Sequence, residues 1–206
     1  KIAKGGPSRT DSVFNGIQIS KKINDIVCIH DVARPFVKTS LIEKTIQYCE
    51  NYDGSILAIG CPAFSVSNGV VRIYQYNNSS WSQLGSDITG LHSGEIFGKS
   101  VALNNDGTIL VASAPRNDTN GTDKGHVRIY QYSNNAWSQL GNTIVGENAL
   151  DEIGESVDIN SDGTIIIIGT MWNDDNGQSS GHARIYKYSN GTWTKDGDDI
   201  DGENAG

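Results

Sequence analysis

One pattern of sixteen residues occurs three times in the chain at a constant spacing. It reads VVRIYQYNNSSWSQLG, then HVRIYQYSNNAWSQLG, then HARIYKYSNGTWTKDG. The first tyrosine of each copy shows the register, because Tyr74, Tyr130 and Tyr186 are 56 residues apart (130 − 74 and 186 − 130). A fixed period of this length is typical of stacked supersecondary units such as solenoids and propellers.

Each repeat predicts four short β-strands and shows no helical period. In the second repeat the strands are residues 97–104, residues 108–115, residues 126–132 and a fourth that starts at Trp137. The Asp-Gly pair between the first two strands is a strong hairpin signal. Four strands in about 56 residues, with glycine at the corners, are typical of a β-propeller blade. We therefore predict all-β, propeller-type, four-stranded blades at about 53–96, 97–152 and 153–206.

These blades do not complete a ring. The first repeat has no counterpart of the strand FGKSVALN, and the chain stops where a next repeat would start. Propellers need about four to eight blades to close. We therefore expect an incomplete propeller with open blade edges, which belongs to something longer or self-associates through those edges.

The wording of the repeat resembles a known family. The segments FGKSVAL, DGTILVASAP and GHVRIYQY are similar to the FG-GAP repeat of integrin α-chain propellers and their bacterial relatives. The resemblance implies an extracellular or cell-surface module that binds a protein or a glycan. The family often carries a calcium loop of the form D-x-D-x-D-G, where this chain has NNDG (104–107) and NSDG (160–163). Because Ca²⁺ takes about six to eight oxygen ligands, we do not expect Ca²⁺ in these loops.

Other polar and aromatic positions of the repeat admit two interpretations. The outer loops gather oxygen ligands, but Asn and Asp are also ordinary turn residues, and we favour turns over a metal site. The loop residues are Asn117, Asp118 and Asp123, and Asn173, Asp174 and Asp175. The repeated tryptophans could stack on a carbohydrate, but we favour packing between blades, and we expect His126 and His182 to be structural. The tryptophans are Trp81, Trp137 and Trp193.

Charge and cysteine content exclude several classes of partner. Residues 1–52 hold eight Lys/Arg and five Asp/Glu, whereas residues 53–206 hold eight (16 − 8) and nineteen (24 − 5), which gives net charges of +3 and −11. The acidic part offers no basic stripe for nucleic acid. No stretch approaches the roughly 20 apolar residues of a membrane span. Cys28, Cys49 and Cys61 lack the spacing of a zinc site or disulfide framework, and we expect the first two in a core.

The first 52 residues predict a partial α/β fold instead. The apolar run DIVCIHD (25–31) is typical of a buried parallel strand, and Ser40 to Glu43 form a capping box that opens a helix. A second apolar strand follows at 55–60, which completes a βαβ unit. Ligands of such sheets bind at the carboxyl ends of strands, where His30, Asp31 and Arg34 lie. An Asp and an Arg there could hold Mg²⁺ and a phosphate, or form a structural pair.

The segments GGPSRTDSVFNGI (5–17) and IHDVARPFV (29–37) resemble 2-C-methyl-D-erythritol 4-phosphate cytidylyltransferases of isoprenoid biosynthesis. The resemblance covers about 60 residues. It implies a Rossmann-like nucleotidyltransferase piece, Mg²⁺, the substrates CTP and methylerythritol phosphate, and a cytoplasmic location. By this resemblance Gly6, Arg9 and Ser12 would bind the cytidine nucleotide. Asp31, near Mg²⁺, and Arg34, on the methylerythritol phosphate, would be the catalytic residues.

The chain departs from this family in ways that bear on activity. The family's glycine-rich basic loop and late catalytic lysine have no counterpart here, and phosphoryl transfer needs several positioned charges. Residues 53–60, DGSILAIG, fit both patterns, and no Pro- or Ser-rich linker separates them. We therefore predict a chimera, in which an inactive cytidylyltransferase segment (1–52) precedes a propeller-type interaction module (53–206). The alternatives are a cytidylyltransferase that retains part of its active site, and a structural repeat without a specific ligand.

Overall fold

The structure is a computed structural model, and it describes residues 56–63, 67–77 and 80–203. The first strand and the helix of the βαβ unit predicted for the N-terminal part lie outside these residues, whereas its second strand (55–60) corresponds to β1 (Ile56–Cys61). The chain divides into two units, one made of Lys1–Ser55 with Gln75–Ser82 and the other of Ile56–Tyr74 with Gln83–Gly206. Nearly all of the described residues belong to the second unit.

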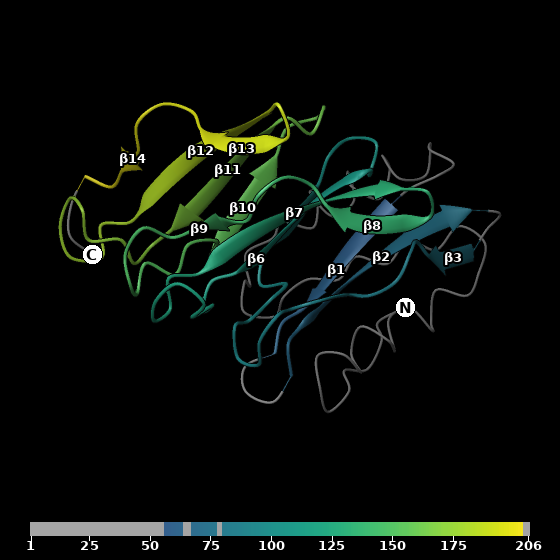
Figure 1. The fold of residues 1–206 in the computed structure, drawn as a ribbon, viewed down its shortest axis with the longest axis horizontal. Helices are drawn as coiled ribbons and strands as arrows, with labels where there is room; N and C mark the ends of the chain where they lie inside the picture. Colours follow the sequence, from purple (N-terminus) through teal and green to yellow (C-terminus); the bar gives the residue numbers. More distant parts are fainter. Residues whose placement is uncertain (1–55, 64–66, 78–79, 204–206) are drawn as a thin grey trace, which may run out of the picture. The chain divides into compact units, whose positions relative to one another are not determined.

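The described residues form fourteen β-strands in three open sheets and contain no helix (Figure 1). No segment of the described part is therefore a helix that could cross a membrane. The first sheet holds β1 (Ile56–Cys61), β2 (Val70–Asn77), β3 (Ser80–Gln83) and β4 (Ile88–Thr89). The second holds β5 (Val101–Leu103), β6 (Ile109–Ala114), β7 (His126–Ser133), β8 (Ala136–Gln139) and β9 (Ile144–Val145). The third holds β10 (Ser156–Ile159), β11 (Ile165–Thr170), β12 (His182–Ser189), β13 (Thr192–Lys195) and β14 (Ile200–Asp201).

The four strands predicted for the second and third repeats are confirmed, and the structure adds a fifth. In the second sheet the order is β5-β6-β7-β8, and the short β9 also pairs with β7. The eight-residue β7 accommodates both partners because β8 pairs with its residues 130–133 and β9 with its residues 126–127. Among the described residues, the first sheet contains only β1, β2, β3 and β4, and the residues that precede β1 are not described.

The first predicted strand of each repeat is shorter than expected. Residues 97–104 contain only β5, and residues 153–160 contain only β10. Gly98 and Gly154, the second residues of these segments, have positive φ angles of 83° and 97°, a left-handed conformation that does not fit an extended strand. The strands therefore start only after the chain has turned.

The turn between the first two strands has the same Asp–Thr hydrogen bonds in the second and third repeats. The Asp106 carboxylate accepts hydrogen bonds from the backbone nitrogen (3.1 Å) and hydroxyl (2.6 Å) of Thr108. Asp162 accepts the same two bonds from Thr164. The hydroxyl bond from Thr108 is the main cause that lowers the pKa of Asp106. These carboxylates therefore stabilise the hairpin turns. The expectation that these loops do not bind Ca²⁺ stays a prediction.

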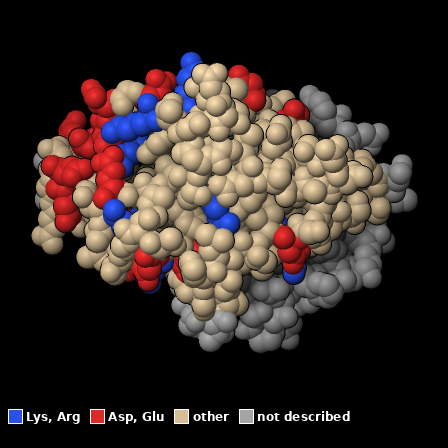
Figure 2. Space-filling view, viewed as in Figure 1, with Lys and Arg blue, Asp and Glu red and all other residues tan. Residues whose placement is uncertain are grey.

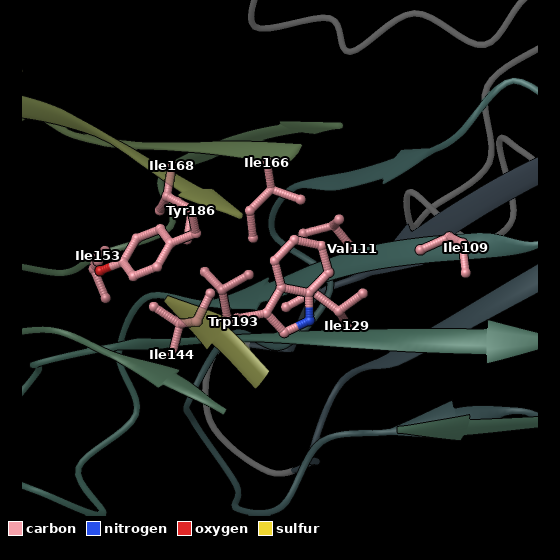
Figure 3. Packing of buried hydrophobic residues seen from close by; sticks show 10 residues of the cluster. Ile109, Val111, Ile129, Ile144, Ile153, Ile166, Ile168, Tyr186 and Trp193 are labelled. Carbon is pink, nitrogen blue, oxygen red and sulfur yellow. The ribbon is translucent and has the colours of Figure 1, made fainter. Parts of the chain in front are cut away.

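Two apolar cores lie between successive sheets, and β6 contributes to both. One core joins Leu110, Ala112 and Ala114 of β6 to Val71 and Ile73 of β2. The other core, shown in Figure 3, contains the alternate residues of β6 together with side chains of the third repeat. Its buried members are Ile109, Val111, Val127, Ile129, Ile144, Ile153, Ile166, Ile168, Tyr186 and Trp193. Because both faces of β6 are covered, all six of its residues are buried.

Candidate functional site

The nucleotide-site residues implied by the N-terminal resemblance lie outside the described part of the chain. They are Gly6, Arg9, Ser12, Asp31 and Arg34, with Asp31 also the implied Mg²⁺ ligand. Their roles, and the core positions expected for Cys28 and Cys49, stay predictions. Cys61, the cysteine that the structure describes, is a free thiol at the end of β1 whose pKa is raised by burial.

Two of the repeated tryptophans bind one repeat to the next. The indole nitrogen of Trp137 donates to the carbonyl oxygen of Leu84 (2.8 Å), and that of Trp193 donates to Leu140 (3.0 Å). In both cases the acceptor belongs to the preceding repeat. Trp193 is only 2% exposed, which confirms packing between repeats and leaves no face for a sugar. Trp81 is 38% exposed.

A glycine lies beneath each of these packed indoles. A Cβ atom at Gly85 would meet Cδ1 of Trp137 at 2.7 Å, and one at Gly141 would meet Cδ1 of Trp193 at 2.9 Å. Both glycines also have positive φ angles, 77° and 75°. The equivalent Gly197 has the same conformation (φ 83°), but a Cβ there would meet nothing within 4 Å. Gly85 and Gly141 therefore leave the space that the indole ring of the following repeat occupies, whereas the equivalent space at Gly197 is open.

The outer loops between the second and third strands are closed by hydrogen bonds from their own aspartates. The Asp118 carboxylate accepts the backbone N–H of Asp123 (2.7 Å), and Asp174 accepts that of Ser179 (2.7 Å). Both contacts close the loop on itself.

The two asparagines that open these loops are fully buried and held by acidic side chains. Asn117 donates to Glu95 (2.5 Å) and Asn173 donates to Asp151 (3.3 Å). Glu95 is 1% exposed and Asp151 is 3% exposed. The sequence reasoning missed these buried carboxylates, although their equal position in the 56-residue register was a signal that could have identified them.

The two strand-opening histidines are buried, which fits their predicted structural role. His126 is 2% exposed and His182 is 5% exposed. Burial, and then the charge of Arg128, lowers the pKa of His126 to about 3. Burial also lowers the pKa of His182, and Arg184 adds to this effect. Both imidazoles are therefore neutral at pH 7.

Among the described residues, the third repeat alone brings a histidine and two carboxylates into a group that could hold a metal ion. Ligand atoms of Asp175, His182 and Asp199 all lie within 4.8 Å of one another. The neighbouring cations are Arg184, whose Nη2 is 2.7 Å from Asp199 Oδ2, and Lys195, whose Nζ is 2.5 Å from Asp199 Oδ1. Sequence reasoning considered Asp175 and His182 separately and missed Asp199, which lies 24 residues beyond Asp175 (199 − 175).

Comparison with known proteins finds a match in the N-terminal part. Residues 1–70 match the family of 2-C-methyl-D-erythritol 4-phosphate cytidylyltransferase. The enzyme of this name from Clostridium botulinum (strain Loch Maree) is 44% identical over 59 residues, which are 29% of this chain and 26% of the relative. The enzyme from Clostridioides difficile is 37% identical over 86 residues, which are 40% of this chain and 35% of the relative. The resemblance of this segment to the family is therefore confirmed.

Among solved structures, similar chains are β-rich but distant. A Bacteroides uniformis protein assigned as a 6-phosphogluconolactonase has a TM-score of 0.44 at 14% identity, covering 71% of this chain and 41% of that one. TolB from Acinetobacter baumannii has a TM-score of 0.34 at 16% identity, covering 69% and 32%. These similarities are too low to assign a function.

The chain spans about a quarter to a third of the length of the curated relatives that it matches. Its N-terminal segment is similar to cytidylyltransferases, and its described part is an all-β repeat.

Proposed function

We propose that the repeat region is an interaction module of incomplete propeller type that docks a further sheet on its third sheet. The observation that carries the proposal is a difference between equivalent positions of two repeats. Ile165, Ile167 and Ile200 of the third repeat are 38%, 42% and 56% exposed. Their counterparts in the second repeat are Ile109, Val111 and Ile144, which are 7%, 0% and 3% exposed.

The counterparts are buried because the following repeat covers them. Ile109 and Val111 pack in one core with Ile166 and Ile168 of β11. The third sheet presents the same apolar face and lacks a following sheet among the described residues. The space above Gly197, which a tryptophan fills at Gly85 and Gly141, is open in the third repeat. Removing such side chains from water contributes about 25 cal/mol per Å² of apolar surface, which offsets the entropic cost of association. The partner that fits is another sheet of this type, and a second copy of the chain supplies one.

Charge sets a condition on this association. The repeat region carries a net charge of −11, the difference between its eight Lys/Arg and nineteen Asp/Glu, so two copies repel each other at long range. Salt screens that repulsion, with a Debye length of about 8 Å at physiological ionic strength. The apolar contact is not weakened by screening. Self-association should therefore become stronger as salt is added.

Sedimentation of the full chain over a range of concentrations tests this proposal at low and high salt. We expect a concentration-dependent larger species that increases with salt and is lost in the double variant Ile167→Lys with Ile200→Lys. Leu150→Lys is the control, because Leu150 is 59% exposed and lies in the loop between β9 and β10. A wild-type chain that stays monomeric at high salt, or a double variant that associates like the control, would refute the proposal.

The family match favours a second candidate function for the N-terminal segment. We propose that this segment descends from a cytidylyltransferase, with CTP and methylerythritol phosphate as the ancestral substrates and Asp31 beside Mg²⁺. The match ends at residue 70, whereas catalysis of nucleotidyl transfer requires several positioned charges. The chain by itself is therefore proposed to be inactive.

An assay with CTP, Mg²⁺ and methylerythritol phosphate decides between these possibilities. No turnover, together with no change on Asp31→Asn, is the expected outcome, and turnover lost in that variant would establish the enzyme instead. The proposed chimera has its own test, because sequencing reads that cross codons 45–65 without a break in coverage would contradict it.

A further inference from the structure

We propose that Asp175, His182 and Asp199 bind a divalent transition-metal ion of the Zn²⁺ class. The site lies at one end of the third sheet. His182 is the first residue of β12, Asp175 belongs to the loop before it, and Asp199 directly precedes β14. Pairing of β14 with β12 brings Asp199 alongside the strand that carries the histidine.

The histidine is the observation that points to a ligand. His182 is 5% exposed, and neither of its ring nitrogens has a hydrogen-bond partner. A buried polar group without a partner is costly, on the order of 1–3 kcal/mol. One of these ring nitrogens lies within 4.8 Å of carboxylate oxygens of both Asp175 and Asp199. A metal ion between the three groups would satisfy the imidazole and neutralise both carboxylates.

The surrounding contacts hold Asp175 in place. Its Oδ2 accepts a hydrogen bond from Asn173 Nδ2 (3.1 Å), and its backbone nitrogen donates to Asn173 Oδ1 (3.1 Å). Asn173 is fully buried and also donates to the buried Asp151. Hydrogen bonds of this kind orient the ligands of metal sites. The loop therefore presents Asp175 toward His182 before any ion binds.

The charged groups that face the site divide into two kinds. Arg184 is fully buried and binds Asp199 Oδ2 and, at 2.8 Å, Glu147, so it orients Asp199 and leaves the other oxygen for an ion. Lys195 lies 2.5 Å from that other oxygen and is 35% exposed, so its ammonium can move into solvent when an ion binds. Figure 2 shows many acidic side chains at the C-terminal end of the described part, which favours a cation there.

The repeat itself provides an internal comparison. At the positions equivalent to Asp175, His182 and Asp199, the second repeat has Thr119, His126 and Thr143. The second repeat therefore has a buried histidine without the two carboxylates. The first repeat has Asp87, which forms a bidentate pair with Arg72, but has Val70 in place of the histidine. The Arg–Asp pair thus occurs in the first and third repeats, and its combination with a histidine and a second carboxylate occurs only in the third.

The ligand set identifies the class of ion. One imidazole nitrogen with two carboxylate oxygens suits Zn²⁺ and similar ions, whereas Ca²⁺ and Mg²⁺ prefer oxygen alone. In a tetrahedral Zn²⁺ site, ligand atoms about 2.1 Å from the ion are about 3.4 Å from one another. Because the three atoms lie within 4.8 Å of one another, they need to approach by at most about 1.4 Å (4.8 − 3.4), and a water molecule would complete the tetrahedron.

Titration of the full chain with Zn²⁺ and with Co²⁺ tests the site. The full chain contains three cysteines, so the Co²⁺ absorption spectrum is needed to separate nitrogen and oxygen ligation from thiolate ligation. We expect one Co²⁺ site without a thiolate charge-transfer band. Asp175→Asn and His182→Gln should each weaken Zn²⁺ binding at least about tenfold. His126→Gln, the matched change in the second repeat, should leave the affinity unchanged.

Two further results decide the assignment. Lys195→Gln should bind Zn²⁺ as tightly as the wild type or more tightly, because it removes a competing cation. Thr119→Asp with Thr143→Asp should raise the stoichiometry from one ion to two, because it copies the site into the second repeat. Affinity unchanged in Asp175→Asn, a spectrum that shows only thiolate ligation, or binding of Ca²⁺ in preference to Zn²⁺ would each overturn the proposal.

Discussion

The glycine beneath each repeated tryptophan allows a prediction in which one substitution is made in two environments. Gly141 and Gly197 occupy the same repeat position, and their φ angles are 75° and 83°. The two glycines differ in the side chains that lie close to them. A Cβ at Gly141 would be 2.9 Å from Cδ1 of Trp193 and 3.1 Å from Cε2 of Tyr188, whereas a Cβ at Gly197 would meet nothing within 4 Å.

The two costs of replacing glycine by alanine can therefore be separated. At both positions alanine must adopt the left-handed conformation, which costs roughly 1–2 kcal/mol. At Gly141 the new methyl group also overlaps a packed indole, and overpacking costs typically about 1–3 kcal/mol. We expect Gly141→Ala to lower the free energy of unfolding by about 2–5 kcal/mol. Gly197→Ala should lower it by only about 1–2 kcal/mol.

Urea unfolding followed by tryptophan fluorescence measures both changes in the full chain. The difference between the two variants should be about 1–3 kcal/mol, which corresponds to a few degrees in Tm for a domain of this size. Equal destabilisation by both substitutions would refute the argument, because it would mean that the indole does not rest on Gly141. A larger effect at Gly197 would mean that another sheet covers that position.

The other predictions concern the buried aromatic and histidine side chains. Trp193→Ala should lower the free energy of unfolding by about 3–5 kcal/mol, and Trp81→Ala should lower it less because Trp81 is 38% exposed, both measured by urea unfolding. Because the pKa of His126 falls from 6.5 to about 3 on folding, the neutral imidazole stabilises the protein above pH 6.5, and this stability is lost as the pH falls toward 3. Between pH 8 and pH 5 the loss should be about 2 kcal/mol, and His126→Gln should make the plot of unfolding free energy against pH less steep; an unchanged slope would contradict the burial of this side chain.

The sequence predicts the strands well where the signal is local. The apolar runs of β6 and β11, the alternating residues of β7 and β12, and the Asp-Gly turns specify their own hairpins. The two-residue strands β9 and β14 carry no such signal, because their pairing depends on the length of the strand beside them.

Buried charges were harder to predict for a similar reason. Arg184 is fully buried, although arginine is usually exposed, and it is paired with Glu147 and Asp199. These partners lie 37 (184 − 147) and 15 (199 − 184) residues away in the sequence, so no local pattern connects them to Arg184. Glu95 is buried by an asparagine 22 residues further on. Composition and periodicity describe each strand separately, and these groups meet only when the loops have been placed around the sheets. The polar sites were therefore less predictable than the strands.

The position of the third sheet gives a last prediction. In repeat proteins, stability is approximately a sum of contributions from each repeat and from its contacts with its neighbours. The second sheet is covered on both faces of β6, whereas β11 of the third sheet alternates between buried and exposed residues. We therefore expect the backbone amides of β11 and β12 to exchange hydrogen faster than those of β6 and β7, because the third sheet opens without disturbing the first core.

Both proposed ligands, a Zn²⁺-class ion and a second sheet, bind this less supported element, so each should slow exchange there. Zn²⁺ should do so in wild type but not in Asp175→Asn, and equal protection of β6 and β11 without ligand would contradict this order of stability.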